Sequence, residues 1–411
     1  MRLTTVLRAQ HIGRMFKKHW LSQGKRKILD TRAENILAAK GIRVVDALEV
    51  VVEKEEITPL KIIGIRPKPI KFDETHPNYH ERKCHLFKDH NVLLEGVKQS
   101  LALTKTVQLK ENCLPEHMET KIQNMEVPDL IHDLVKKAIF TANVFDPEQE
   151  KLPKVKDPLR PAFNFPRRLG ITDQRKNFLL SSKLLRLCEM SSTVSKRNML
   201  KNAYFSLPFE KDGDLIQFEL NVENFIVTDE PLKPIHNDVT QTEQLELHNM
   251  FPIKPTITLT QENIYDLKNK YPLTSFSKMD APHTMLLNYT PTYVHNLYET
   301  PVTSDQILGR SMIKCFTVAS AFAKRKHGDD VETLPEPICV QCIQTDGRLF
   351  DFSVFQLNTM NLNGAEGIKN IWYQTEQMPL YTICAYDKGI PILEGYNPEI
   401  MKYLFAFYRN Q

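Results

Sequence analysis

Apolar side chains recur at helical spacing in several stretches of the chain. Residues 128–143 and 173–190 carry them every three or four positions, which predicts two amphipathic helices. Residues 305–326 form the longest such stretch, with Ser304 as the expected cap, a basic end and Gly328 beyond it. The same pattern predicts a last helix that opens at Asn397 and Pro398, and shorter helices over 33–48 and 91–106.

Elsewhere the apolar pattern has a period of two. Residues 216–222 alternate between apolar and polar, and Asp212-Gly213 joins them to the run 204–209. Asp346-Gly347 joins 338–345 to 348–358 in the same way, and a further strand pair flanks 387–389. Asp-Gly between two strands predicts a β-hairpin because glycine accepts a positive φ. Hairpins and helices without βαβ repeats predict an α+β fold with a largely antiparallel sheet built from hairpins.

Two proline-spaced basic segments interrupt these patterns. The stretch 59–72 predicts an extended arm, although an ordinary linker fits equally well, and 146–168 holds five prolines, six basic residues and no glycine. We expect 59–75 and 146–168 to be extended and poorly packed. The predicted organisation is a mitochondrial transit peptide over 1–30, an extended arm over 31–75, a helical N-terminal region over 76–145, a Pro-rich basic linker over 146–170 and a main α+β domain over 171–411.

The transit peptide is predicted from the position of the charge. The net charge is +4, but residues 1–29 contain eight basic and no acidic side chains, so the remainder has 46 basic against 50 acidic residues and a net charge of −4. An Arg-rich, acid-free, amphipathic start is typical of a mitochondrial transit peptide, while a retained RNA-binding arm is the alternative. No apolar stretch reaches the roughly 20 residues that a membrane span needs.

Few residues suggest a chemical site. The spacing of His76, His80 and Cys84 would suit a metal only on a helix, and Pro77 argues against one there. Cys339-x-x-Cys342 lies in a predicted strand, where residues three apart point to opposite faces, which favours buried thiols. No phosphate-binding loop, GxSxG or HExxH motif is present. The sequence predicts no catalytic residue, metal, cofactor or small-molecule substrate.

Basic side chains remain as candidates for contact with RNA phosphates or with a protein partner, although a solvated surface is an equally good interpretation of each cluster. The candidates are Arg160, Arg167, Arg168, Arg175, Lys176, Lys196, Arg197, Lys201, Lys324, Arg325, Lys326, Arg348 and Lys369.

Four sequence blocks carry a resemblance. They are 93–99 (LLEGVKQ), 263–269 (NIYDLKN), 282–284 (PHT) and a long block from Thr345 through Thr359 to Trp372. In this order they resemble the mitochondrial large-subunit ribosomal protein thirty-seven family, from about residue 76 to the C-terminus. The resemblance implies a structural, non-enzymatic subunit of the mitochondrial ribosome, located in the matrix. It also implies contact with large-subunit rRNA and with neighbouring proteins, including the related subunit once numbered thirty of the small subunit.

Two other functions stay open at this point. One is a matrix RNA-binding factor that is not fixed to the ribosome, which the acidic balance of residues 30–411 disfavours. The other is a matrix enzyme with an unrecognised site, which the lack of any catalytic motif disfavours.

Overall fold

The chain divides into two units, residues 1–70 and 71–411. In the first unit the structure describes a short helix, α2 (Ala33–Ala39), which ends where Gly41 takes a φ of +72°. The helix predicted over 33–48 is therefore shorter than expected. The predicted transit peptide and residues 59–71 of the predicted arm lie outside the described residues. This computed structural model describes residues 32–45, 72–154, 159–160, 163, 165–192, 197–274, 277–290, 292–296 and 300–411.

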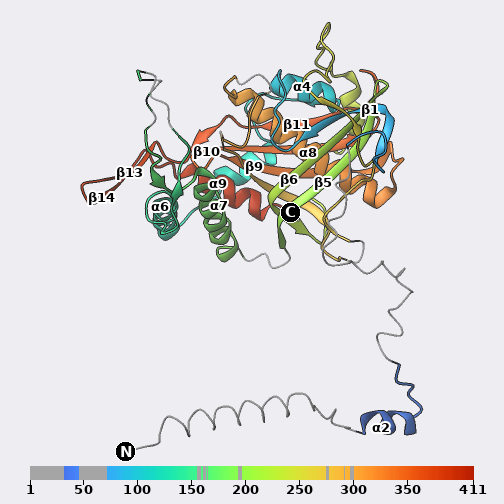
Figure 1. Ribbon diagram of the computed structural model, residues 1–411, viewed down its shortest axis with the longest axis horizontal. Coiled ribbons are helices and arrows are strands. Elements are labelled where there is room, and N and C mark those ends of the chain that lie inside the picture. The colour runs from blue at the N-terminus through green and yellow to red at the C-terminus, as the bar shows by residue number, and fades with distance from the viewer. Residues whose placement is uncertain are drawn as a thin grey trace, which may run out of the picture. The chain divides into compact units, whose positions relative to one another are not determined.

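A ten-stranded sheet forms the second unit (Figure 1). Its strand order is β2-β11-β10-β9-β8-β6-β1-β7, with β5 beside β6 and β12 beside β10. β1–β6, β8–β9 and β11–β2 pair in parallel, and the other pairs are antiparallel. The α+β class is confirmed, and the sheet is mixed. The strands are β1 Tyr79–Lys88, β2 Thr106–Gln108, β5 Asn198–Lys211, β6 Asp214–Thr228, β7 Thr260–Ile264, β8 Ala281–Asn288, β9 Thr333–Thr345, β10 Leu349–Thr359, β11 Asn370–Gln374 and β12 Met378–Pro379.

The predicted hairpins are present. β5 and β6 meet at Asp212 and Gly213, both with positive φ, and β9 and β10 meet at Asp346-Gly347. Gly347 is needed for a second reason, because a Cβ there would lie 2.1 Å from Oδ1 of Asn177. Outside the large sheet, two small sheets pair β13 (Ile383–Asp387) with β14 (Ile390–Glu394), and β3 (Glu150–Lys151) with β4 (Leu169–Gly170).

Helices cover both faces of the sheet. On one face α8 (Ser304–His327) packs on β9 and β10 and beneath α4 (Gly96–Leu103). On the other face a second apolar core joins four helices to the sheet. These are α5 Glu116–Gln123, α6 Asp129–Asn143, α7 Asp173–Met190 and α9 Glu399–Arg409, and a short 3-10 helix, η1, spans Val239–Gln244. The helices expected over 128–143, 173–190 and near the C-terminus are confirmed.

The long helix α8 differs from the prediction in its cap and its burial. Thr303, rather than Ser304, is the N-cap, and it forms a capping box with Gln306. Most of α8 is buried around its whole circumference, because α4 covers the side that faces away from the sheet. The two helices approach closely at Gly309, where a Cβ would lie 2.5 Å from the backbone carbon of Gly96.

The region 76–145 is less helical than predicted. β1 occupies a segment with no predicted element, and the helix expected over 91–106 is limited to α4, followed by β2. Each strand pairs in parallel with a strand that is distant in sequence, β1 with β6 and β2 with β11, which a local pattern does not reveal. Because His80 and Cys84 lie on a strand, they do not share a helical face; the described residues contain no group of three potential metal ligands.

The predicted Pro-rich linker is exposed. Its described residues from 147 to 168 are exposed or half-buried, and their regular structure is the short β3–β4 pairing at the base. The Cys339-x-x-Cys342 segment is in β9, as predicted, and both thiols are buried. Burial raises the pKa of Cys339 to about 12, which makes its thiol unreactive at neutral pH. No helix among the described residues is long and apolar enough to cross a membrane.

Candidate RNA and partner interface

The candidate basic residues fall into groups that differ in what holds their side chains. Arg160, Arg167 and Arg168 are exposed between β3 and β4. Their side chains make no ion pair or hydrogen bond with any residue that the structure describes. Arg348, at the β9–β10 turn, is also exposed. These four guanidinium groups are free to meet another molecule.

Two candidates on α7 are held by acids of the same chain. Arg175 pairs with Asp146 and also with Glu148, whose Oε2 lies 2.6 Å from its Nη1. Lys176 pairs with Asp173 one turn earlier at 3.0 Å. Arg175 thus fixes the chain entering β3 against the first turn of α7, which is a structural role.

Two candidates lie at the start of β5 in different surroundings, Arg197 just before the strand and Lys201 within it, while Lys196 lies outside the described residues. Arg197 donates from Nη2 to the carbonyl oxygen of Asn410 at 2.8 Å and lies over the ring of Tyr408. Lys201 is exposed, and its Nζ lies 5.6 Å from the centre of the Phe178 ring. Lys201 can reach a partner, whereas Arg197 ties β5 to the C-terminal residues.

At the end of α8 the three basic residues also divide. Lys324 donates to the carbonyl oxygen of Pro208 at 2.7 Å. Arg325 pairs with Asp280 at 2.8 Å and donates to a backbone carbonyl. Lys326 is exposed beside the Phe322 ring, so it is the one of the three whose charge faces solvent.

Lys369 is not at the surface, contrary to the prediction. Its side chain is only 2% exposed, and Nζ donates to the carbonyl oxygens of Thr242, Glu243 and Gly367 at 3.1–3.4 Å. The buried ammonium group satisfies three carbonyls and so ties η1 to the residues just before β11, where it cannot contact a partner.

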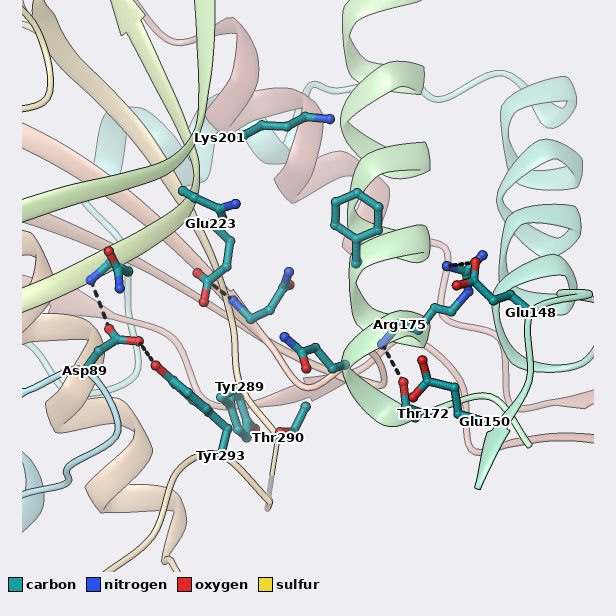
Figure 2. Close-up of a pocket in the computed structure, with 15 residues that line it drawn as sticks. Asp89, Glu148, Glu150, Thr172, Arg175, Lys201, Glu223, Tyr289, Thr290 and Tyr293 are labelled. Atoms are coloured by element: carbon teal, nitrogen blue, oxygen red, sulfur yellow. Dashed lines mark hydrogen bonds and ion pairs between the residues drawn. The ribbon is translucent and has the colours of Figure 1, made fainter. Parts of the chain in front are cut away.

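A cavity of about 570 Å³ opens between β5, β6, α7 and the loop after β8. Figure 2 shows its charged lining, in which Lys201 and Arg175 are opposed by carboxylates. Glu223 accepts a hydrogen bond from the backbone N–H of Asn288 at 3.2 Å. Among the lining residues, carboxylates outnumber basic side chains by four to two. The four carboxylates are Asp89, Glu148, Glu150 and Glu223.

Asp89 in the cavity lining also belongs to a buried charged cluster, which we name the α8 cluster: Asp89, Arg310 and Lys314. Nζ of Lys314 lies 2.7 Å from Oδ1 of Asp89, and Nη2 of Arg310 lies 3.4 Å from it. Arg310 also donates from Nε and Nη2 to the backbone carbonyl of Asp89 at 3.1 and 2.9 Å. Both basic side chains are fully buried.

The α8 cluster holds Asp89 ionised. Burial opposes ionisation, but Lys314 and Arg310, with hydrogen bonds from Lys314 and the Asn221 N–H, lower the pKa of Asp89 to about 2. Tyr293 donates to the other carboxylate oxygen at 3.0 Å (Figure 2). Sequence reasoning missed this cluster, although two basic residues four apart on an otherwise apolar helix were a usable signal.

Comparison with known proteins gives two concordant results. Residues 303–411 match the family described as "Mitochondrial 28S ribosomal protein S30 (PDCD9)". The chain is 27% identical to the large ribosomal subunit protein mL37 of Bos taurus, over 82% of this chain and 77% of that protein. It is 27% identical to mL37 of Rattus norvegicus and 26% identical to mL37 of Gallus gallus, in each case over 74% of this chain and 67% of the relative.

The chain is a relative of mL37. The resemblance found in the sequence blocks is thereby confirmed. The segment that matches the second mitoribosomal family, 303–411, runs from the cap of α8 to the end of the chain and includes Arg310 and Lys314. The similarity to mL37 extends over most of the chain, so it spans both faces of the sheet rather than a single motif.

Proposed function

We propose that this chain is a structural constituent of the large subunit of the mitochondrial ribosome and acts in the mitochondrial matrix. The observation that carries the proposal is its similarity to mL37 over 82% of its length. Its role is to support mitochondrial translation by holding large-subunit rRNA and neighbouring proteins in place. We include among those neighbours the related subunit whose family matches residues 303–411.

The described contacts support a structural rather than an enzymatic role. In the 570 Å³ cavity, the carboxylate of Asp89 is fixed by two basic side chains and a tyrosine, and Glu223 is bound to a backbone N–H. The buried thiols of Cys188 and Cys339 have pKa values raised to about 12 by burial. These two carboxylates and two thiols are thus held or buried by the fold.

The test is sedimentation of a mitochondrial lysate on a sucrose gradient, with the chain followed by antibody. We expect it to co-migrate with large-subunit rRNA and to shift to the top of the gradient when magnesium is chelated and the subunit unfolds. A chain that stays at the top in magnesium would overturn the proposal. A chain that carries RNA outside the large-subunit peak would instead support an RNA-binding factor that is not fixed to the ribosome.

A further inference from the structure

The segment between β3 and β4 exposes positive charge and aromatic rings together. Residues 151–168 contain six basic side chains and one acidic side chain, a net charge of +5. We name its described distal residues, 159–160, 163 and 165–168, the basic loop. In the basic loop the side chains of Arg160, Arg167 and Arg168 are exposed and contact no carboxylate among the described residues.

The aromatic rings of the basic loop face solvent. Phe163 is 57% exposed and Phe165 is 41% exposed, and their rings meet edge to face at 4.6 Å between centroids. Each therefore retains an open ring surface, while neither belongs to an apolar core of the second unit. Two exposed phenylalanine rings in contact form a small apolar surface that a partner can cover, unlike a single exposed ring.

The base of the loop is firmly attached to the rest of the unit. Glu150 and Lys151 pair with Gly170 and Leu169, and the N–H of Leu152 donates to the carbonyl oxygen of Arg168 at 2.8 Å. Below it, Arg175 holds Glu148 and the buried Asp146 against α7. Anchored ends reduce the entropy that the loop loses on binding.

Arginines without acidic partners, within a few residues of open phenylalanine rings, are a combination that suits single-stranded RNA. Bases stack on the aromatic faces, and the guanidinium groups contact the phosphates. In a double-stranded RNA helix the base faces are stacked on one another, so a duplex could contact only the arginines of the loop and not the phenylalanine rings. The structure assigns the basic loop as a site for unpaired RNA, with Phe163 and Phe165 as the stacking platform and Arg160, Arg167 and Arg168 as the phosphate contacts. This inference rests on the proposed function, within which the unpaired RNA is a loop of the large-subunit rRNA.

The binding experiment uses the full chain with two probes, a 20-nucleotide single-stranded RNA and a 20-base-pair RNA duplex. We expect the single strand to bind more tightly, and F163A/F165A to weaken its binding about tenfold or more while changing duplex binding less than twofold. F163Y/F165Y retains the rings and should restore affinity. Phe251, another exposed phenylalanine, provides the matched control, and F251A should bind as the wild type does.

The charge contribution is read from the salt dependence. Replacing the three arginines with glutamine should reduce the slope of log affinity against log salt by about 2 for a single strand, and replacing them with lysine should preserve it. Unchanged single-strand binding in F163A/F165A would overturn the inference. Tighter binding to a 20-residue polyglutamate than to RNA would overturn it in favour of an acidic protein partner.

Sedimentation of the wild-type chain separates this inference from the proposed function. If the chain is absent from the large-subunit peak but F163A/F165A loses single-strand binding, the proposed function fails and the RNA site stands. If the chain is in the peak and ultraviolet cross-linking joins the basic loop to no rRNA, the RNA site fails and the proposed function stands.

Discussion

The α8 cluster and the basic loop use the same kinds of charged side chain in opposite ways. In the α8 cluster, Arg310 and Lys314 are fully buried and donate hydrogen bonds to Asp89 and to backbone carbonyls. In the basic loop, three arginines are exposed and have no acid from the described chain against them. The difference separates the charges that the fold needs from those that it leaves for another molecule.

Burial and ion pairing divide the candidate contacts into engaged and available residues, which their clustering in the sequence does not do. Arg175, Arg197, Lys324, Arg325 and Lys369 are engaged by their own chain, and the last of them is buried. The exposed set contributes little to folding, because ion pairs and cations at the surface are worth about 0–1 kcal/mol. Substitutions in the two regions should therefore have separable effects on stability and on binding.

The largest expected effect comes from removing the acid of the α8 cluster. D89N leaves Arg310 and Lys314 buried without a counter-charge, and we expect a loss of about 3–5 kcal/mol in the free energy of unfolding. Urea denaturation of the full chain measures it. D387N, on the exposed β13–β14 turn, is the matched control and should change stability by less than about 0.5 kcal/mol.

The same cluster predicts a dependence on acid. The folded-state pKa of Asp89, about 2, is below its ordinary value of 3.8, so its contribution is present above about pH 4 and is lost as pH falls toward 2. The wild type should lose more stability than D89N over that interval. Parallel acid curves for the two proteins would show that Asp89 is not held ionised by its neighbours.

A second buried acid beneath α8 predicts the opposite pH dependence. Burial raises the pKa of Asp351 to about 7, and its Oδ1 has no hydrogen-bond partner among the described residues. Its stabilising contribution is therefore greatest below about pH 4 and is lost as pH rises to about 7. D351N should be more stable than the wild type, by an amount that grows on the order of 2 kcal/mol from pH 5 to pH 8. Denaturation midpoints at the two pH values decide it, and a pH-independent difference would contradict it.

Lys369 and Lys326 test the contrast with one residue type. K369M leaves three buried carbonyls without their donor, and we expect a loss of about 1–3 kcal/mol. K326M removes an exposed ammonium and should be nearly neutral. Thermal unfolding of the two variants measures the difference. Equal stability of the two variants would show that the hydrogen bonds of Lys369 do not stabilise the fold.

The sequence was informative where structure is local. The spacing of apolar residues located α6 and α7, and Asp-Gly pairs located both long hairpins, because helix period and turn geometry depend on neighbouring residues. It was uninformative where partners are distant. β1 pairs with β6 more than a hundred residues away, and the salt partner of Lys314 is Asp89.

The sequence shows which residues of the candidate interface are basic, but it does not show which of them are exposed and unpaired. Lys369 and Arg348 were equivalent as sequence letters, yet one is buried and the other exposed. Likewise Arg175 and Arg168 belong to one basic run, but only Arg175 has Asp146 and Glu148 within reach, since that depends on how α7 packs against the chain before β3. Burial and ion pairing depend on the tertiary structure, so the basic residues that remain available at the surface can be identified only once the fold is known.

The smallest expected effect on stability comes from replacing the arginines of the basic loop. Replacing Arg160, Arg167 and Arg168 with glutamine removes three charges that no described side chain compensates, so the free energy of unfolding should change by less than about 0.5 kcal/mol. Urea denaturation measures it beside R175Q, which breaks the ion pairs with Asp146 and Glu148 that anchor β3 and should destabilise the fold more than the triple replacement does. If the triple variant were destabilised as much as R175Q, the three arginines would contribute to folding. The distinction between charges that the fold uses and charges available to a partner would then not hold for the basic loop.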